Sequence, residues 1–161
     1  MNLDTIFGLP VHPLLVHAVV VLLPLACLGA TAIALRFSWR ERFGTLVLAV
    51  AVVATLAVPL VTDSGESLAA RVGNPADHAE QGDAVKFYVI PWILLLIAML
   101  WWSRPSQAAR SFPTQKWFLV LRLAVVFMSL STIVGIAITG HSGAQATWKK
   151  LIANTSPAAG G

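Results

Sequence analysis

Residues 12–35 read HPLLVHAVVVLLPLACLGATAIAL, an apolar run that opens with two histidines, His12 and His17. About 20 apolar residues in a helix cross the hydrocarbon core of a bilayer, so this stretch predicts a membrane-spanning helix. Three further apolar stretches of similar length follow it along the chain. The four predicted helices have the approximate bounds 14–35, 43–62, 85–102 and 117–139. We therefore expect an all-α fold, a four-helix transmembrane bundle.

The composition agrees with a membrane protein. Of the 161 residues, 57% are hydrophobic and only 11% are charged, whereas about a quarter of the residues of a soluble domain are charged. The net charge of +4 does not indicate nucleic acid as a partner, because the basic residues lie in short loops between apolar stretches rather than on a soluble surface. The expected surroundings are a lipid bilayer.

The beginning of the chain does not have the pattern of a secretory signal peptide. The first twelve residues include Asp4 but no lysine or arginine, and the apolar run that follows is too long for a signal sequence. The one cysteine, Cys27, excludes an internal disulfide and is expected to be a small packing residue. We expect residues 1–152 to form a single membrane domain and residues 153–161 to be disordered.

The loop charges predict an orientation. Basic residues dominate the loops after the first and third helices, whereas acidic residues dominate the loop after the second: Asp63, Glu66, Asp77, Glu80 and Asp83. Cytoplasmic loops of membrane proteins are enriched in lysine and arginine. We therefore place both termini and the 63–83 loop outside the bacterial cytoplasmic (inner) membrane. Tryptophans are expected at the two membrane surfaces: Trp39, Trp101, Trp102 and Trp117 inside, Trp92 and Trp148 outside.

The outer loop between the second and third helices is expected to be helical in part. Residues 66–72 can form a short helix that Gly73 breaks. Asn74 and Pro75 then have the pattern of a helix start, and that helix continues through His78 into the third span.

All four histidines of the chain fall at the outer side in this topology: His12, His17, His78 and His141. Ionisable side chains beside membrane segments are candidates for function, and neutral imidazole is the commonest protein ligand for metals. Three carboxylates lie near them in the sequence: Asp63, Glu66 and Glu80. We therefore expect a site that the four histidines form together, and two chemistries fit it.

In the first, two histidines on different helices bind the iron of haem b for electron transfer. His17 with His141 is the preferred pair, because His17 is expected to face the bundle interior, and His12 with His78 is a shallower alternative. In the second, three or four of the histidines bind zinc, copper or iron, with Asp63, Glu66 and Glu80 as further ligands or as their hydrogen-bond partners.

A third interpretation belongs to another class, an accessory or anchoring subunit of a membrane complex that holds no cofactor. The sequence has no hydrolase or transferase motif: it lacks a His-Glu-x-x-His pattern, a Walker loop and a nucleophile with a flanking base. An enzymatic role, if there is one, is therefore expected to be that of a redox subunit.

The fourth helix carries a stripe of small residues at intervals of four: Ser131, Gly135, Thr139 and Gly143. Such a stripe lets two helices approach closely, either inside the bundle or between copies in a homo-oligomer. If the helix continues past Gly140, His141 lies on the face opposite to the stripe.

Four segments of the chain resemble a bacterial membrane family, the domain of unknown function 2231, in particular its actinobacterial members. They are residues 9–17 (LPVHPLLVH), 64–66 (SGE), 78–83 (HAEQGD) and 140–144 (GHSGA) with Trp148. The resemblance covers nearly the whole chain and implies a four-helix membrane protein whose motif histidines are the four named above. Many members have Phe-Pro where this chain has Ala18 and Val19.

Some members of this family are linked to Rieske iron–sulfur domains, which favours an electron-transfer function. The present chain has no Cys-His pairs that could hold such a cluster. Any redox partner is therefore expected to be a separate protein.

Overall fold

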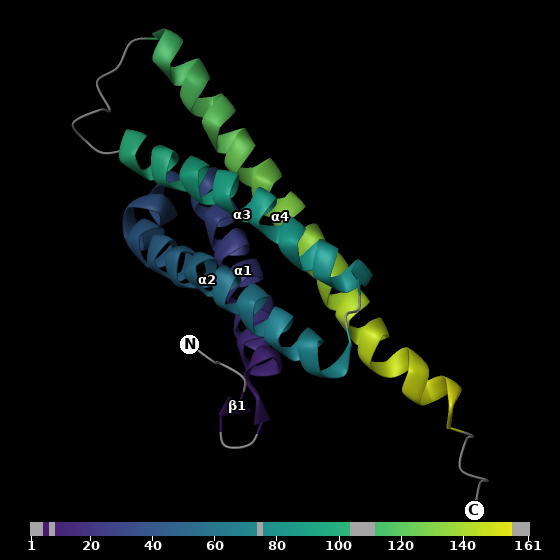
Figure 1. Ribbon diagram of the computed structural model, residues 1–161. Helices are drawn as coiled ribbons and strands as arrows, with labels where there is room; N and C mark the ends of the chain where they lie inside the picture. The colour runs from purple at the N-terminus through teal and green to yellow at the C-terminus, as the bar shows by residue number, and fades with distance from the viewer. Residues whose placement is uncertain (1–4, 7–8, 74–75, 104–111, 156–161) are drawn as a thin grey trace, which may run out of the picture.

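The computed structural model describes residues 5–6, 9–73, 76–103 and 112–155. Two short strands, β1 (Thr5–Ile6) and β2 (Leu9–Pro10), pair antiparallel at the start of the chain. Four helices follow: α1 (Val11–Leu35), α2 (Phe37–Val72), α3 (Ala76–Trp102) and α4 (Phe112–Ala153) (Figure 1). Each helix is long and apolar enough to cross a membrane, which confirms the predicted all-α fold.

The helices are longer than the apolar stretches that predicted them. Residues 66–72, expected to form a separate short helix, are instead the last two turns of α2. No residue interrupts this part of the helix, and the hydroxyls of Ser64 and Ser67 donate to the Val61 and Asp63 carbonyls of the preceding turn. The helix ends, as predicted, at Gly73, whose φ of 96° favours glycine.

Two predicted features concern residues outside the described part of the chain. Asn74 and Pro75, interpreted as a helix start, are not among the described residues, although α3 begins at Ala76 and includes His78 as expected. Of the predicted disordered tail, Ala153 is the last residue of α4, and residues 156–161 are not described.

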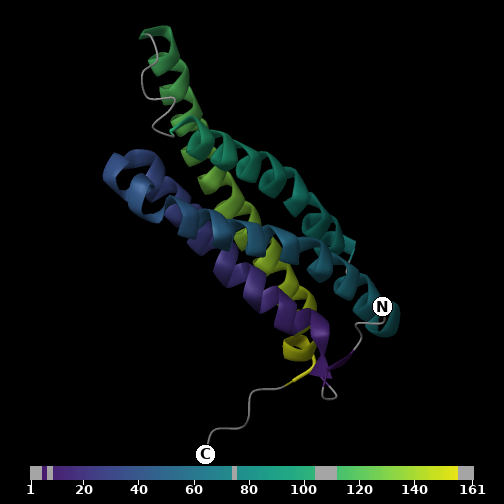
Figure 2. The same cartoon turned by 90° about the vertical axis from the view of Figure 1, so that its left-hand side faces the viewer.

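The bundle is built from two helical hairpins. Arg36 alone joins α1 to α2, so these helices run antiparallel side by side. α3 and α4 form the second hairpin, and the two hairpins meet where α1 packs on α4 and α2 packs on α3 (Figure 2). One end of the bundle contains the start of α1, the end of α2, the start of α3 and the end of α4. We name it the histidine end, after His12 and His78, and name the opposite end the arginine end, after Arg40 and Arg122.

Small side chains form the face of α1 that packs inside the bundle. Ala26, Cys27, Ala30 and Ala34 are at most 2% exposed, so neighbouring backbones can approach closely. Cys27 is therefore the packing residue that the sequence predicted.

Trp92 was expected at the outer membrane surface but lies in the core, where it is fully buried. Its indole Nε1 donates to Ser129 Oγ on α4 at 2.8 Å. A buried indole needs a partner for its N–H group, and Ser129 supplies it. The prediction for Trp92 was wrong because the sequence did not reveal this acceptor on another helix.

The outward faces of the helices are apolar. Val21, Leu28, Leu46 and Leu56 are all at least 58% exposed, as expected of side chains that contact lipid. Exposed Val20, Val21 and Leu28 share a face of α1 with His17, which is exposed too. The prediction that His17 faces the bundle interior is therefore wrong for this chain.

Candidate functional site

His12 stands at the start of α1 and bonds to α2. Its Nδ1 lies 3.0 Å from the Val61 carbonyl oxygen and 3.2 Å from Ser64 Oγ. The carbonyl can only accept a hydrogen bond, and the Ser64 hydroxyl already donates its proton to the same carbonyl at 2.9 Å. The network therefore assigns the proton of the neutral ring to Nδ1 and leaves Nε2 with a free lone pair.

His78 is held in the same way in the second hairpin. Its Nδ1 lies 3.2 Å from Ser142 Oγ on α4. The Ser142 hydroxyl donates to the Thr139 carbonyl at 2.9 Å, three residues earlier in its own helix. Ser142 Oγ therefore accepts from His78, so Nδ1 again carries the proton and Nε2 again has a free lone pair.

A glycine follows each of these serines and makes room for the imidazole. A Cβ added at Gly65 would lie 2.9 Å from Cε1 of His12, and a Cβ added at Gly143 would lie 2.9 Å from Cε1 of His78. Both distances are too short for a real side chain. In each hairpin, one histidine near the start of the first helix thus packs against a Ser-Gly pair of the second helix, with equivalent contacts.

We call His12 with its Ser-Gly pair one half-site and His78 with its Ser-Gly pair the other. The two half-sites meet at the histidine end of the bundle. The ring centroids of His12 and His78 are 6.5 Å apart, and the ring planes are inclined at 73°. Two imidazoles that are neutral in the same tautomer can both act as Lewis bases through Nε2. The pair can therefore bind a metal ion or accept a proton.

The structure does not bring His17 and His141 into this pair. His17 is exposed on α1, and its Nδ1 donates to the Pro13 carbonyl of its own helix. His141 is exposed on α4, where it accepts a hydrogen bond at 3.0 Å from Gln145 Nε2, also in its own helix. The pair that the structure brings together is therefore His12 with His78, which the sequence interpretation gave as the shallower alternative.

The three candidate carboxylates do not join the histidines either. Asp63, Glu66 and Glu80 are exposed. Among the residues that the structure describes, no three His, Cys, Asp or Glu side chains are grouped in a way that could hold a metal ion. A site with three or four protein ligands, as the second chemistry requires, is not assembled by the described part of the chain.

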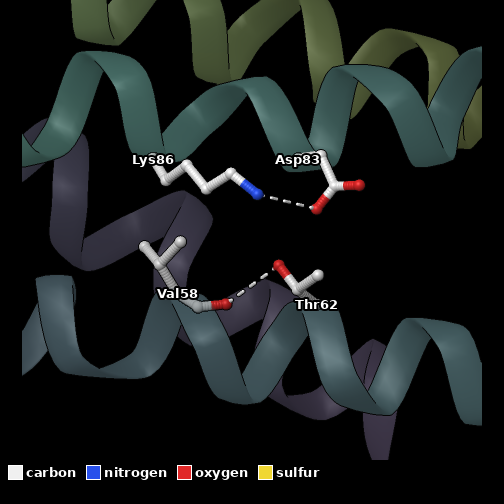
Figure 3. Close-up of polar contacts among 4 residues, drawn as sticks. All are labelled: Val58, Thr62, Asp83 and Lys86. Atoms are coloured by element: carbon white, nitrogen blue, oxygen red, sulfur yellow. Dashed lines mark hydrogen bonds and ion pairs between the residues drawn. The ribbon is translucent and has the colours of Figure 1, made fainter.

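Lys86 on α3 and Thr62 on α2 each find a polar partner within their own helix. On α3, Lys86 Nζ lies 3.5 Å from Asp83 Oδ1, and on α2 the Thr62 hydroxyl donates to the Val58 carbonyl at 3.4 Å (Figure 3). The Asp83 carboxylate is therefore paired with the Lys86 ammonium group.

The small-residue stripe of α4 is used inside the chain. A Cβ at Gly135 would touch the Tyr88 ring of α3 at 3.4 Å, and the Thr139 hydroxyl lies 3.4 Å from the Gln81 carbonyl oxygen of α3. Together with Gly143 beside His78, these residues let α3 and α4 pack closely. Because α4 continues through Gly140, His141 lies on the opposite face, as predicted.

Ser64 and Ser142 are the functional candidates that the sequence interpretation missed. A signal for them exists, because the dipeptide Ser-Gly occurs only at these two places in the chain. Each occurrence lies in the second helix of a hairpin, at the histidine end of the bundle, and follows a histidine near the start of the first helix of the same hairpin.

The fold and this site define an integral membrane protein, a four-helix bundle with a pair of ordered histidines at one end. A family model described as Predicted membrane protein (DUF2231) matches residues 8–156, and the chain belongs to that family. The resemblance noted from the sequence motifs is thereby confirmed. No curated protein and no solved structure matches the chain.

Proposed function

We propose that the protein binds b-type haem through His12 and His78 and carries electrons at the outer side of the membrane. The observation that supports this is the pair itself: two imidazoles from different hairpins, 6.5 Å apart, each with its Nδ1 proton bonded to its own hairpin. Histidines that bind a metal through one nitrogen usually donate a hydrogen bond from the other.

The number of donors favours haem over an ion held by protein ligands alone. Structural zinc sites use four protein ligands and catalytic ones three, whereas haem iron has four nitrogens from the porphyrin and needs the protein only for its axial positions. Two histidines complete that requirement. Four-helix bundles hold cofactors between facing helices in this way.

The spacing of the rings agrees with two ligands of one metal. The ring centroids of His12 and His78 are 6.5 Å apart, so the two imidazoles are near enough that both could be ligands of one metal. His12 with His78 therefore takes the place of His17 with His141 as the proposed axial pair.

Each residue of the site has a physical role in this proposal. Ser64 and Ser142 fix the tautomer and the orientation of the rings, and Gly65 and Gly143 leave the space that the rings occupy. Haem, when bound, supplies a one-electron carrier. The neutral Nε2 atoms supply the lone pairs that ligation requires.

The test is the absorption spectrum of the full-length protein, gently solubilised after expression with added haem precursor. We expect a Soret band with sharp bands in the reduced state. The double variant His12→Ala with His78→Ala should lose them, whereas His17→Ala with His141→Ala, which removes the same number of imidazoles, should keep them.

Two results would reject the haem proposal. A wild-type sample without a Soret band would do so, as would equal spectra for the two double variants. A colourless sample that contains stoichiometric zinc, copper or iron would support the non-haem alternative, and a colourless sample free of metal would support an accessory or anchoring subunit.

We further propose that the histidine end faces outward in a bacterial cytoplasmic membrane. The support is the excess of arginine at the other end, including Arg36, Arg40 and Arg42 on or beside the α1–α2 connection. A Glu80→Cys variant in a Cys27→Ala background should react with an impermeant thiol reagent added to intact cells. Labelling only after lysis would invert the orientation.

An outward site needs an electron donor or acceptor on that side of the membrane, and we propose a separate redox protein or membrane complex as this partner. A homo-oligomer, if it forms, needs a surface other than the small-residue stripe, because Gly135, Thr139 and Gly143 already contact α3.

A further inference from the structure

Arg40 is a buried cation at the arginine end of the bundle. Only 7% of its surface is exposed, although arginine is almost never fully buried unless it is paired. Its guanidinium carbon lies 5.2 Å from the ring centroid of Phe37 and 5.0 Å from that of Phe118 on α4. These cation–π contacts attract the charge, but they provide no oxygen acceptor for its N–H groups.

Two donors of this guanidinium lack a partner. Nε and Nη1 of Arg40 are buried, and no residue in the described part of the chain accepts a hydrogen bond from either. Buried donors of this kind are rare in folded proteins and call for an acceptor. A charged donor forms its strongest hydrogen bonds with an anion.

A second guanidinium is close by. Arg122 on α4 donates through Nε to the Ala34 carbonyl and through Nη2 to the Leu35 carbonyl at 3.3 Å. These bonds hold it at the C-terminal end of α1, and its positive charge acts on Arg40. Like charges repel, so the place where α1, α2 and α4 meet is electropositive.

The chain itself offers hardly any anion to this place. Segments 36–42 and 103–122, which lead into and out of the arginine end, contain one acidic residue, Glu41. Glu41 is exposed on α2 next to Arg40 in the sequence. Its negative charge acts on Arg40 from a distance, but among the described residues no hydrogen bond or ion pair joins the two side chains. The described part of the chain therefore leaves this guanidinium open to an acceptor from outside.

We propose that Arg40, with Arg122, binds a phosphate group at the arginine end. The planar fork of arginine matches two phosphate oxygens, and basic pockets between membrane helices bind acidic lipid head groups. The site also lies at the right depth, because the neighbouring Trp39 is 43% exposed and exposed tryptophans are typical of the head-group region. A phospholipid head group and free phosphate share this chemistry. The proposal does not depend on haem.

The experiment uses the full chain in a detergent that contains no phosphate, and a thiol-reactive fluorescent dye that labels Cys27 when the bundle unfolds. The unfolding temperature is measured while phosphatidylglycerol, phosphatidylcholine or inorganic phosphate is added. For the wild type we expect a saturable rise with phosphatidylglycerol. For Arg40→Gln, the concentration that gives half of this rise should increase by about tenfold or more.

The matched control is Arg42→Gln, which removes the same charge from an exposed position two residues away. It should respond like the wild type. A rise with phosphatidylglycerol alone assigns the site to lipid head groups, and a rise with inorganic phosphate as well shows that a free phosphate suffices. Both results support a phosphate site.

The proposal is overturned if none of the additives stabilises the wild type, or if the two variants lose the response equally. If Arg40→Gln does not fold, native mass spectrometry gives the answer from the other two proteins. Both should retain phosphatidylglycerol through purification, and a wild type that retains none would also overturn the proposal.

Discussion

At the histidine end of the bundle, His12 and His78 each donate a hydrogen bond to the second helix of their own hairpin. At the arginine end, Arg40 is buried more deeply than either histidine, yet Nε and Nη1 find no acceptor among the described residues. Both ends place ionisable side chains where helices converge. In the described part of the chain, both histidines have acceptors for Nδ1, whereas at the arginine end Arg122 has acceptors and Arg40 Nε and Nη1 do not.

This difference indicates how each end depends on its surroundings. A satisfied network orients its members before any ligand arrives, so each of the two imidazoles is preorganised within its own hairpin. An unsatisfied buried charge lowers stability until an acceptor is supplied. Substitutions at the histidine end should therefore destabilise the protein, whereas a substitution that removes the charge of Arg40 should stabilise it when phosphate is absent.

The largest loss of stability is expected when a side chain fills the space that the imidazole of His12 or His78 occupies. Gly65→Leu or Gly143→Leu places side-chain atoms where Cε1 of His12 or His78 lies, and overpacking of this kind costs about 1–3 kcal/mol of stability. The measurement is the unfolding temperature from Cys27 labelling. Gly140→Ala is the control, because a Cβ there meets nothing within 4 Å. Equal results for Gly143→Leu and Gly140→Ala would contradict the described packing.

A gain in stability, rather than a loss, is expected from a substitution at the arginine end. In detergent without phosphate or lipid, Arg40→Met should raise the free energy of unfolding by about 1 kcal/mol, because it removes buried donors that lack acceptors. The exposed Arg42, changed to Met as a control, should have little effect. Destabilisation by Arg40→Met under these conditions would contradict this expectation, because the contacts that the guanidinium makes within the protein would then outweigh its unpaired donors.

The smallest change in stability is expected from removing the serine hydroxyls, and its size should differ between the two hairpins. Ser142 is the one acceptor described for His78 Nδ1, whereas His12 Nδ1 also contacts the Val61 carbonyl. Ser142→Ala should therefore cost about 1 kcal/mol, and Ser64→Ala about 0.5 kcal/mol or less. The same unfolding assay measures both. Losses of equal size would show that the second acceptor of His12 does not compensate.

The sequence was sufficient to predict the fold, because hydrophobic length alone identifies spanning helices. It could not predict which face of α1 turns inward. His12 and His17 are five residues apart, so they point in directions about 140° apart on one helix, and apolar residues surround both. The better signal was residue size: Ala26, Ala30 and Ala34 lie on the buried face.

The site could be predicted only in part. The grouping of histidines at one end follows from the order of the helices, and His12 and His78 do meet there. Their serine partners required knowledge of which helices pair. Arg40 gave no signal at all, since a basic residue beside a span is ordinarily a solvated topology marker, and its burial depends on Phe118, a residue 78 positions away in the chain.

The Ser-Gly pair of each hairpin has one more consequence. Because every hydrogen bond described for His12 and His78 stays within one hairpin, each imidazole is oriented before the hairpins dock. The docking of the two hairpins decides the distance and the angle between the rings. That distance therefore depends on how the hairpins tilt against each other, and tilt responds to bilayer thickness. A thicker or thinner membrane would change the spacing of the pair while both halves remain intact.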